Sequence, residues 1–95
     1  MATVTFNGTL IAESDDIEMV EGNPYFPISS VRDDVLVESE HHTVCSWKGT
    51  ASYWTIDVDG ERAENAAWYY PEPKTGAEMV TDRVAFYKHQ VDIAA

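Results

Sequence analysis

The sequence has 95 residues, with six Lys or Arg against seventeen Asp or Glu, so its formal net charge is -11 at pH 7. Such an acidic surface repels phosphate groups, which excludes double-stranded nucleic acid as a partner. Apolar residues make up 44% of the chain, which is typical of a folded globular domain and not of a disordered one. No apolar run reaches the roughly 18 residues that a membrane span requires, so we expect no membrane association.

The N-terminal residues and the cysteine content predict a cytoplasmic protein. Met1 is not followed by the basic stretch that begins a secretion signal. The single cysteine, Cys45, excludes an internal disulfide and a multi-cysteine zinc site. The acidity is also typical of salt-adapted proteins, and an ordinary acidic prokaryotic protein is the equal alternative.

The first forty residues read as short strands separated by tight turns. Asn7-Gly8 favours a type I′ hairpin turn, because both of its residues accept a positive φ. Ser30 with Asp33 predicts the cap of one short helical turn. The strands expected in this half are residues 4–6, 9–12, 17–20 and a brief buried strand at 35–37.

Residues 52–58 form the clearest expected strand. Trp54, Ile56 and Val58 alternate onto one face of it, and Tyr53 points to the other. Asp59-Gly60 predicts a second hairpin turn. The remaining expected elements are a return strand reaching residue 70, one helical turn opened by a capping box at Thr75–Glu78, and strands at 84–87 and 91–93.

Short strands with frequent turn signals predict a mainly β fold. We expect one small domain over residues 1–95, a sandwich or barrel of antiparallel strands with one or two short helical turns.

The metal-binding and phosphate-binding motifs are weak in this sequence. Its five glycines form no phosphate-binding loop. His41 and His42 precede Cys45, but adjacent strand residues point to opposite faces, so at most one of the two histidines joins Cys45 in a site. We therefore interpret them as part of a solvated loop and expect no metal and no cofactor.

Cys45 and Lys48 are the candidate reactive pair. A nearby ammonium group favours the thiolate, which would make Cys45 a nucleophile or a redox thiol. The alternatives are a cysteine that acts as a small buried hydrophobe and a lysine that is an exposed, solubilising charge. Both interpretations stay open at this point.

Aromatic residues are concentrated between residues 47 and 70. Trp54 is assigned to the core because it alternates with Ile56 and Val58. Tyr53 lies on the opposite face, so that face either packs against a second layer or lines a pocket.

Several blocks of residues resemble a known family, the domain of unknown function 427 family. Ser46 is a departure, since the family often has proline after the cysteine. Together the blocks cover most of residues 3–93. They are Tyr25–Pro27, Thr43–Trp54, Asn65–Pro73 and Val84–Tyr87.

The resemblance implies a β-tent-like fold, in which two coiled antiparallel sheets meet at an angle over a pocket. Proteins of that architecture include methionine sulfoxide reductase B and the ligand-binding domain of cereblon. Many carry a zinc ion on paired cysteines, which Cys45 alone cannot provide. The family also carries a nucleotidyltransferase label, but this sequence has no carboxylate pair in a metal-binding motif to support it.

Our leading hypothesis is a small-molecule-binding β domain. Cys45, Lys48, Tyr53 and Trp68 are expected to converge on an aromatic pocket, with Tyr25 and Tyr69 at its rim. Lys48 would bind an anionic or carbonyl group of the ligand, and the acid-free segment 45–53 marks the place.

Two other classes of function remain open. One is an enzyme that uses Cys45 as a nucleophile or redox thiol, or that has the family's nucleotidyltransferase activity. The other is a structural or protein-interaction module, with Trp47 and Tyr53 on a surface that binds a partner or a second copy.

Overall fold

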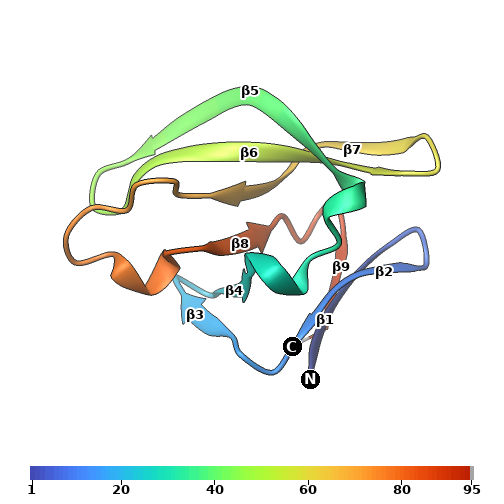
Figure 1. The fold of residues 1–95 in the computed structure, drawn as a ribbon, viewed down its shortest axis with the longest axis horizontal. Coiled ribbons are helices and arrows are strands. Elements are labelled where there is room, and N and C mark those ends of the chain that lie inside the picture. Colours follow the sequence, from blue (N-terminus) through green and yellow to red (C-terminus); the bar gives the residue numbers. More distant parts are fainter. Residues whose placement is uncertain (95) are drawn as a thin grey trace.

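The computed structural model describes residues 1–94, which form two antiparallel sheets (Figure 1). The six-stranded sheet extends from the top of the view down to its lower left, and the three-stranded sheet lies at the lower right. A mainly β fold with two antiparallel sheets is thereby confirmed. None of the helical turns in this part of the chain is long and apolar enough to cross a membrane.

The strands follow one another in each sheet as a series of antiparallel neighbours. The three-stranded sheet has the order β2 (Thr9–Ser14), β1 (Ala2–Phe6), β9 (Asp92–Ala94). The six-stranded sheet has the order β3 (Glu18–Val20), β4 (Asn23–Pro27), β8 (Arg83–Phe86), β7 (Glu61–Tyr69), β6 (Gly49–Val58), β5 (Leu36–Cys45).

Both predicted hairpin turns are present. Asn7 and Gly8, between β1 and β2, have φ angles of 50° and 80°. Asp59 and Gly60, between β6 and β7, have φ angles of 52° and 85°. The Asp57 carboxylate accepts the Gly60 N–H at 3.0 Å, so this carboxylate stabilises the turn. Positive φ at both central positions is the geometry that fits the twist of antiparallel strands.

Residues 1–94 contain three 3-10 turns, where one or two helical turns were predicted. They are η1 (Ile28–Ser30), η2 (Asp33–Val35) and η3 (Glu78–Val80). The predicted caps are wrong. The Ser30 hydroxyl donates back to the Pro27 carbonyl at 2.7 Å and caps no following turn. The turn η3 begins at Glu78, with Ala77 as its N-cap residue and no side-chain cap, so Thr75 does not cap it. The Glu78 carboxylate instead accepts the Gly76 N–H at 3.0 Å.

Strand β5 differs most from expectation. Residues 35–37 were predicted as a brief buried strand, but β5 runs from Leu36 to Cys45, and its Val37 is exposed. His41 and His42 therefore lie in a strand and not in a loop, although both are exposed. Because β5 is the edge strand and is exposed on both faces, it lacks the apolar alternation by which strands are recognised.

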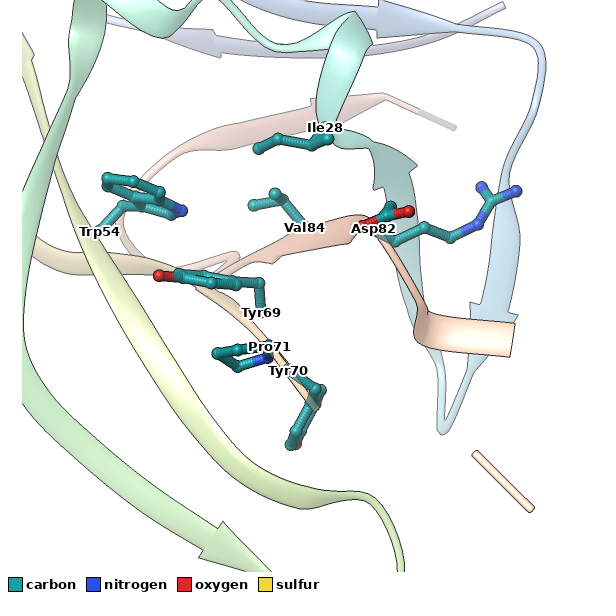
Figure 2. Close-up of a pocket in the computed structure, with 8 residues that line it drawn as sticks. Ile28, Trp54, Tyr69, Tyr70, Pro71, Asp82 and Val84 are labelled. Atoms are coloured by element: carbon teal, nitrogen blue, oxygen red, sulfur yellow. The ribbon is translucent and has the colours of Figure 1, made fainter. Parts of the chain in front are cut away.

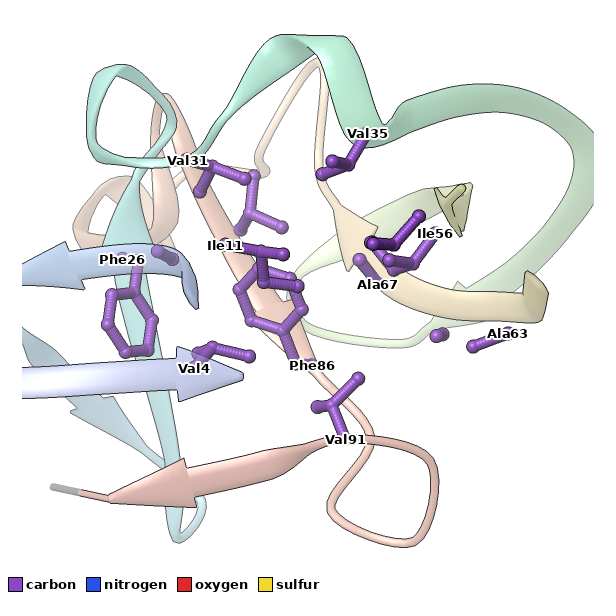
Figure 3. Close-up of a cluster of buried hydrophobic side chains, with 14 of the residues drawn as sticks. Val4, Ile11, Phe26, Val31, Val35, Ile56, Ala63, Ala67, Phe86 and Val91 are labelled. Carbon is purple, nitrogen blue, oxygen red and sulfur yellow. The ribbon is translucent and has the colours of Figure 1, made fainter. Parts of the chain in front are cut away.

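One face of the six-stranded sheet packs against the three-stranded sheet through an apolar core (Figure 3). Ile56 is fully buried there, with Trp54 packed against its edge, as the alternation predicted. Burial of this apolar surface is the main stabilising term of a small domain. The core comprises Ala2, Val4, Ile11, Ala12, Phe26, Val31, Val35, Ile56, Val58, Ala63, Ala66, Ala67, Val84, Phe86 and Val91.

The opposite face of the same sheet carries a second set of buried residues, which we call the aromatic cluster. Tyr53 belongs to it, so the face opposite Trp54 does pack a second layer. Its members are Val20, Tyr25, Ala51, Tyr53, Trp68, Tyr70, Ala77, Val80 and Ala85, with Cys45 and Tyr87 at the edge.

Shortening one buried side chain should show how much stability the apolar core supplies. We expect Ile56→Val to lower the free energy of unfolding by about 1 kcal/mol, because it leaves an unfilled methyl-sized space. Val44→Thr, on the exposed part of β5, should change it by less than about 0.5 kcal/mol. Urea unfolding curves of both variants measure the difference, and equal effects would contradict this assignment of the core.

Candidate functional site

Lys48 is buried in the aromatic cluster and is not an exposed, solubilising charge. It lies in the turn between β5 and β6 and is only 5% exposed. Its ammonium group donates a hydrogen bond to Glu21. The same nitrogen lies 5.3 Å from the ring centroid of Trp47 and 5.4 Å from that of Tyr70. A cation at such a distance is attracted by the negative face of an aromatic ring.

The β5–β6 turn is fixed in place by the segment that follows β7. The Lys74 N–H donates to the Lys48 carbonyl at 3.0 Å, and the Lys74 ammonium donates to the Ser46 carbonyl at 2.9 Å. Gly49 has a φ of +120°, and a side chain there would approach the Glu72 carbonyl at 3.2 Å. Glycine is thus required for the close approach of these two segments.

Burial alone would lower the pKa of Lys48, but the hydrogen bond to Glu21 and the nearby Tyr25 and Tyr70 outweigh it. The pKa is therefore raised, and Lys48 stays protonated. The hydrogen bond from Lys48 in turn lowers the pKa of Glu21. The Glu21 carboxylate also accepts the Trp47 indole N–H at 3.5 Å, so one carboxylate holds both residues of the turn.

Hydrogen bonds and ring contacts connect the aromatic side chains. The Trp68 indole donates to the Tyr25 hydroxyl at 3.1 Å, with the two rings perpendicular. The Tyr87 ring lies 4.5 Å from that of Trp68, and its hydroxyl is 3.2 Å from that of Tyr53. Tyr53 is also 2.9 Å from the Thr43 hydroxyl. A fully bonded network of this kind rigidifies the cluster.

The rim of the cluster is polar and open to solvent. His41 lies over Tyr53, with 4.6 Å between ring centroids, and His89 lies 5.4 Å from Tyr87. Cys45 is half-buried at this edge, and Trp47 is 39% exposed. The rim therefore presents aromatic faces, a thiol and imidazoles, all of which can contact a bound molecule.

Five of the six candidate residues come together in this region. Cys45, Lys48, Tyr53, Trp68 and Tyr25 all belong to the cluster or contact it. Tyr25 is completely buried, so it lies at the centre and not at the expected rim.

Tyr69 is the exception among the candidates. It lies on the opposite face of the sheet, where its ring stacks on Trp54 at 5.3 Å. Successive residues of a strand alternate between faces, so Trp68 and Tyr70 enter the aromatic cluster and Tyr69 cannot.

Sequence reasoning missed Glu21, the partner of Lys48. Glu21 precedes Gly22 in the turn between β3 and β4, and its φ of 54° fits that turn. Nothing in the sequence relates it to a lysine 27 positions later. The segment 45–53 has no acidic residue in sequence, but Glu21 brings a carboxylate to it in space.

A cavity lies beside the stacked rings of Trp54 and Tyr69, and Tyr70 of the aromatic cluster also lines it (Figure 2). It encloses about 190 Å³. The best-formed cavities among residues 1–94 are lined by residues other than Cys45, Lys48, Tyr53 and Trp68. The residues around this cavity are Ile28, Trp54, Tyr69, Tyr70, Pro71, Asp82, Arg83 and Val84.

Within residues 1–94, no group of three or more His, Cys, Asp or Glu side chains is arranged to hold a metal ion. Asp57 and Asp59 belong to the β6–β7 hairpin, where Asp57 also pairs with Arg62.

Two antiparallel sheets, with an apolar core on one face of the larger sheet and the aromatic cluster on the other, define a small all-β domain. The chain belongs to the family described as a domain of unknown function (DUF427, NTP_transf_9), whose family model matches residues 1–95. No curated protein matches the sequence.

Removing the partner of Lys48 should destabilise the fold more than removing the pair. We expect Glu21→Gln to lower the melting temperature, because a buried ammonium is left without its carboxylate. The double variant Glu21→Gln with Lys48→Met should recover most of the loss. Glu18→Gln, an exposed residue on β3, is the matched control. A double variant less stable than Glu21→Gln alone would contradict this account.

Two of the five tyrosines should ionise at a higher pH than an unperturbed tyrosine does. Burial raises the pKa of Tyr70 to about 12, and the hydrogen bond with Tyr53 raises that of Tyr87 to about 12. In the unfolded chain both ionise near 10, so the folded state retains protons that the unfolded state loses. Stability is therefore expected to fall between pH 10 and pH 12. When the folded protein is titrated with base, the phenolate absorbance should show a second phase above pH 10, and Tyr87→Phe should reduce the amplitude of that phase. A single phase near pH 10 would contradict this prediction.

Proposed function

We propose that this protein is a small-molecule-binding domain whose ligand lies against the rim of the aromatic cluster, beside Trp47, Lys48 and Cys45. The ligand is a planar, uncharged molecule with a carbonyl group. Its ring would stack on Trp47, and its carbonyl oxygen would accept a hydrogen bond from Lys48.

The observation that supports this proposal is a protonated lysine buried among aromatic rings. A buried ion pair is seldom the most stable way to fill a cluster, since apolar residues of similar size often do as well or better. Charged groups with shifted pKa values gather at functional sites. Lys48 has three N–H donors and Glu21 accepts one of them, so donors remain for a ligand.

The residues of the rim favour one chemical class of ligand. Trp47 is 39% exposed and offers an aromatic face close to the Lys48 ammonium. Planar molecules gain from offset stacking on such a face. The overall charge of -11 repels anions, and Glu21 already neutralises Lys48. We therefore favour a carbonyl over an anionic group as the partner of Lys48.

The enzymatic alternative depends on activation of Cys45 by Lys48. The hydrogen bond of the Lys48 ammonium goes to Glu21, and its other close neighbours are the rings of Trp47 and Tyr70. These contacts favour a binding role for Lys48 over the activation of a thiol.

Uracil is a suitable probe, because it is planar and uncharged and carries two carbonyls. We expect it to shift the backbone amide resonances of residues 45–49 and of Glu21 and Gly22. Trp47→Ala should weaken binding about tenfold, which corresponds to the loss of a stacking contact. Val44→Thr, an exposed neighbour, should leave binding unchanged.

Benzoate tests the charge preference and should bind more weakly than uracil. The proposal fails if uracil shifts no resonances at this rim, or if Trp47→Ala binds uracil as tightly as the unmodified protein does.

A further inference from the structure

We infer that the cavity lined by Trp54, Tyr69 and Val84 is a second binding site, which takes an uncharged single-ring molecule carrying a hydrogen-bond acceptor. The site lies mainly on the opposite face of the sheet from the aromatic cluster, and Tyr70 of that cluster also lines it. Trp47, Lys48 and Cys45 do not line it, so the inference does not depend on the proposed function.

The cavity has one aromatic side and one aliphatic side. The Trp54 and Tyr69 rings lie 5.3 Å apart and within 20° of parallel, which makes one continuous aromatic surface. Figure 2 shows Val84 and Ile28 facing the enclosed space from the other side. Val84 is 1% exposed, whereas Ile28 is 39% exposed and lies at the opening.

The volume of the cavity limits the ligand to a small molecule. The cavity encloses about 190 Å³. A protein cavity of roughly 150 Å³ holds one benzene molecule, so this cavity has room for one ring with a short substituent. Pockets for drug-sized ligands start at roughly 300 Å³, so larger ligands are excluded unless they project through the opening.

The indole N–H of Trp54 favours a ligand that carries a hydrogen-bond acceptor. The nitrogen is buried and has no hydrogen-bond partner among the described residues. It is turned toward the space between Ile28, Val84 and Tyr69 (Figure 2). Buried polar groups in folded proteins nearly always have a partner, so each exception calls for an explanation. Solvent does not reach this nitrogen, so a carbonyl oxygen on a ligand in this cavity would accept the unused N–H once a neighbouring side chain moves aside.

The charges around the cavity disfavour an anion. Asp82 presents a carboxylate at the edge, and its backbone carbonyl accepts the Ile28 N–H at 2.9 Å. Arg83 also lines the cavity, but its guanidinium donates to the Asp16 carboxylate at 2.8 Å and to the Tyr25 carbonyl at 3.2 Å. The positive charge is thus neutralised, and the negative charge of Asp82 remains.

Three probes of similar size separate these requirements: benzamide, toluene and benzoate. Toluene lacks the acceptor, and benzoate carries a negative charge. We expect benzamide to shift the amide resonances around residues 28, 54, 69 and 84. Toluene should bind about tenfold more weakly, the value of one neutral hydrogen bond to a buried group. Benzoate should also bind more weakly than benzamide, because its negative charge would lose solvation and face Asp82.

Two variants test the site, with one control. Trp54→Phe removes the N–H, so benzamide binding should weaken about tenfold and toluene binding should persist. Ile28→Trp fills the opening from an exposed position and should abolish binding of both. Val44→Thr, on the exposed part of β5 and away from the cavity, should bind benzamide normally. The dispersion of the amide spectrum shows whether each variant is folded.

The inference is overturned if benzamide does not bind, if Trp54→Phe binds it unchanged, or if toluene binds as well as benzamide does. Trp47→Ala should bind benzamide normally, because that residue belongs to the other face. The two proposals can therefore fail separately.

Discussion

Strand β6 has to bury side chains on both of its faces, and the architecture follows from how the two faces are covered. Tyr53 and Trp54 are adjacent in sequence, so they must point in opposite directions. The three-stranded sheet covers the Trp54 face with apolar residues. On the Tyr53 face, Ala77 and Val80 from the segment between β7 and β8 pack against the aromatic cluster. A chain of this length has few residues to spare, so each face combines packing with surfaces that can bind ligands.

The contact between Lys48 and Glu21 joins two turns that are distant in sequence. It holds the β3–β4 turn against the β5–β6 turn, and Trp47 donates to the same carboxylate. The geometry of the candidate rim therefore depends on an ion pair and not only on apolar packing. Because Glu21 is half-exposed, this contact stays accessible to solvent while Lys48 itself is buried.

Local signals predicted much of the fold, and non-local contacts explain most of the differences. The Asn7-Gly8 and Asp59-Gly60 turns and the alternation along residues 52–58 depend on neighbouring residues, so they can be read from sequence. The bounds of strand β5 could not be predicted in this way, because an edge strand exposed on both faces shows no apolar alternation. The candidate residues of the cluster came from a family resemblance and aromatic content. The Glu21 partner and the cavity beside Trp54 arise only from tertiary packing.

The pairing of β1 with β9 has a consequence for how the chain folds. Residues 3–5 pair with residues 92–94, so this sheet joins strands separated by almost the whole sequence. Closing so long a loop costs chain entropy before any contact offsets it, and folds rich in such pairings form slowly. On the ribosome, β1 and β2 can pair early, whereas the third strand must wait until residue 94 has emerged. Until then one edge of β1 is unpaired, which makes the nascent chain most open to mispairing at its first strand.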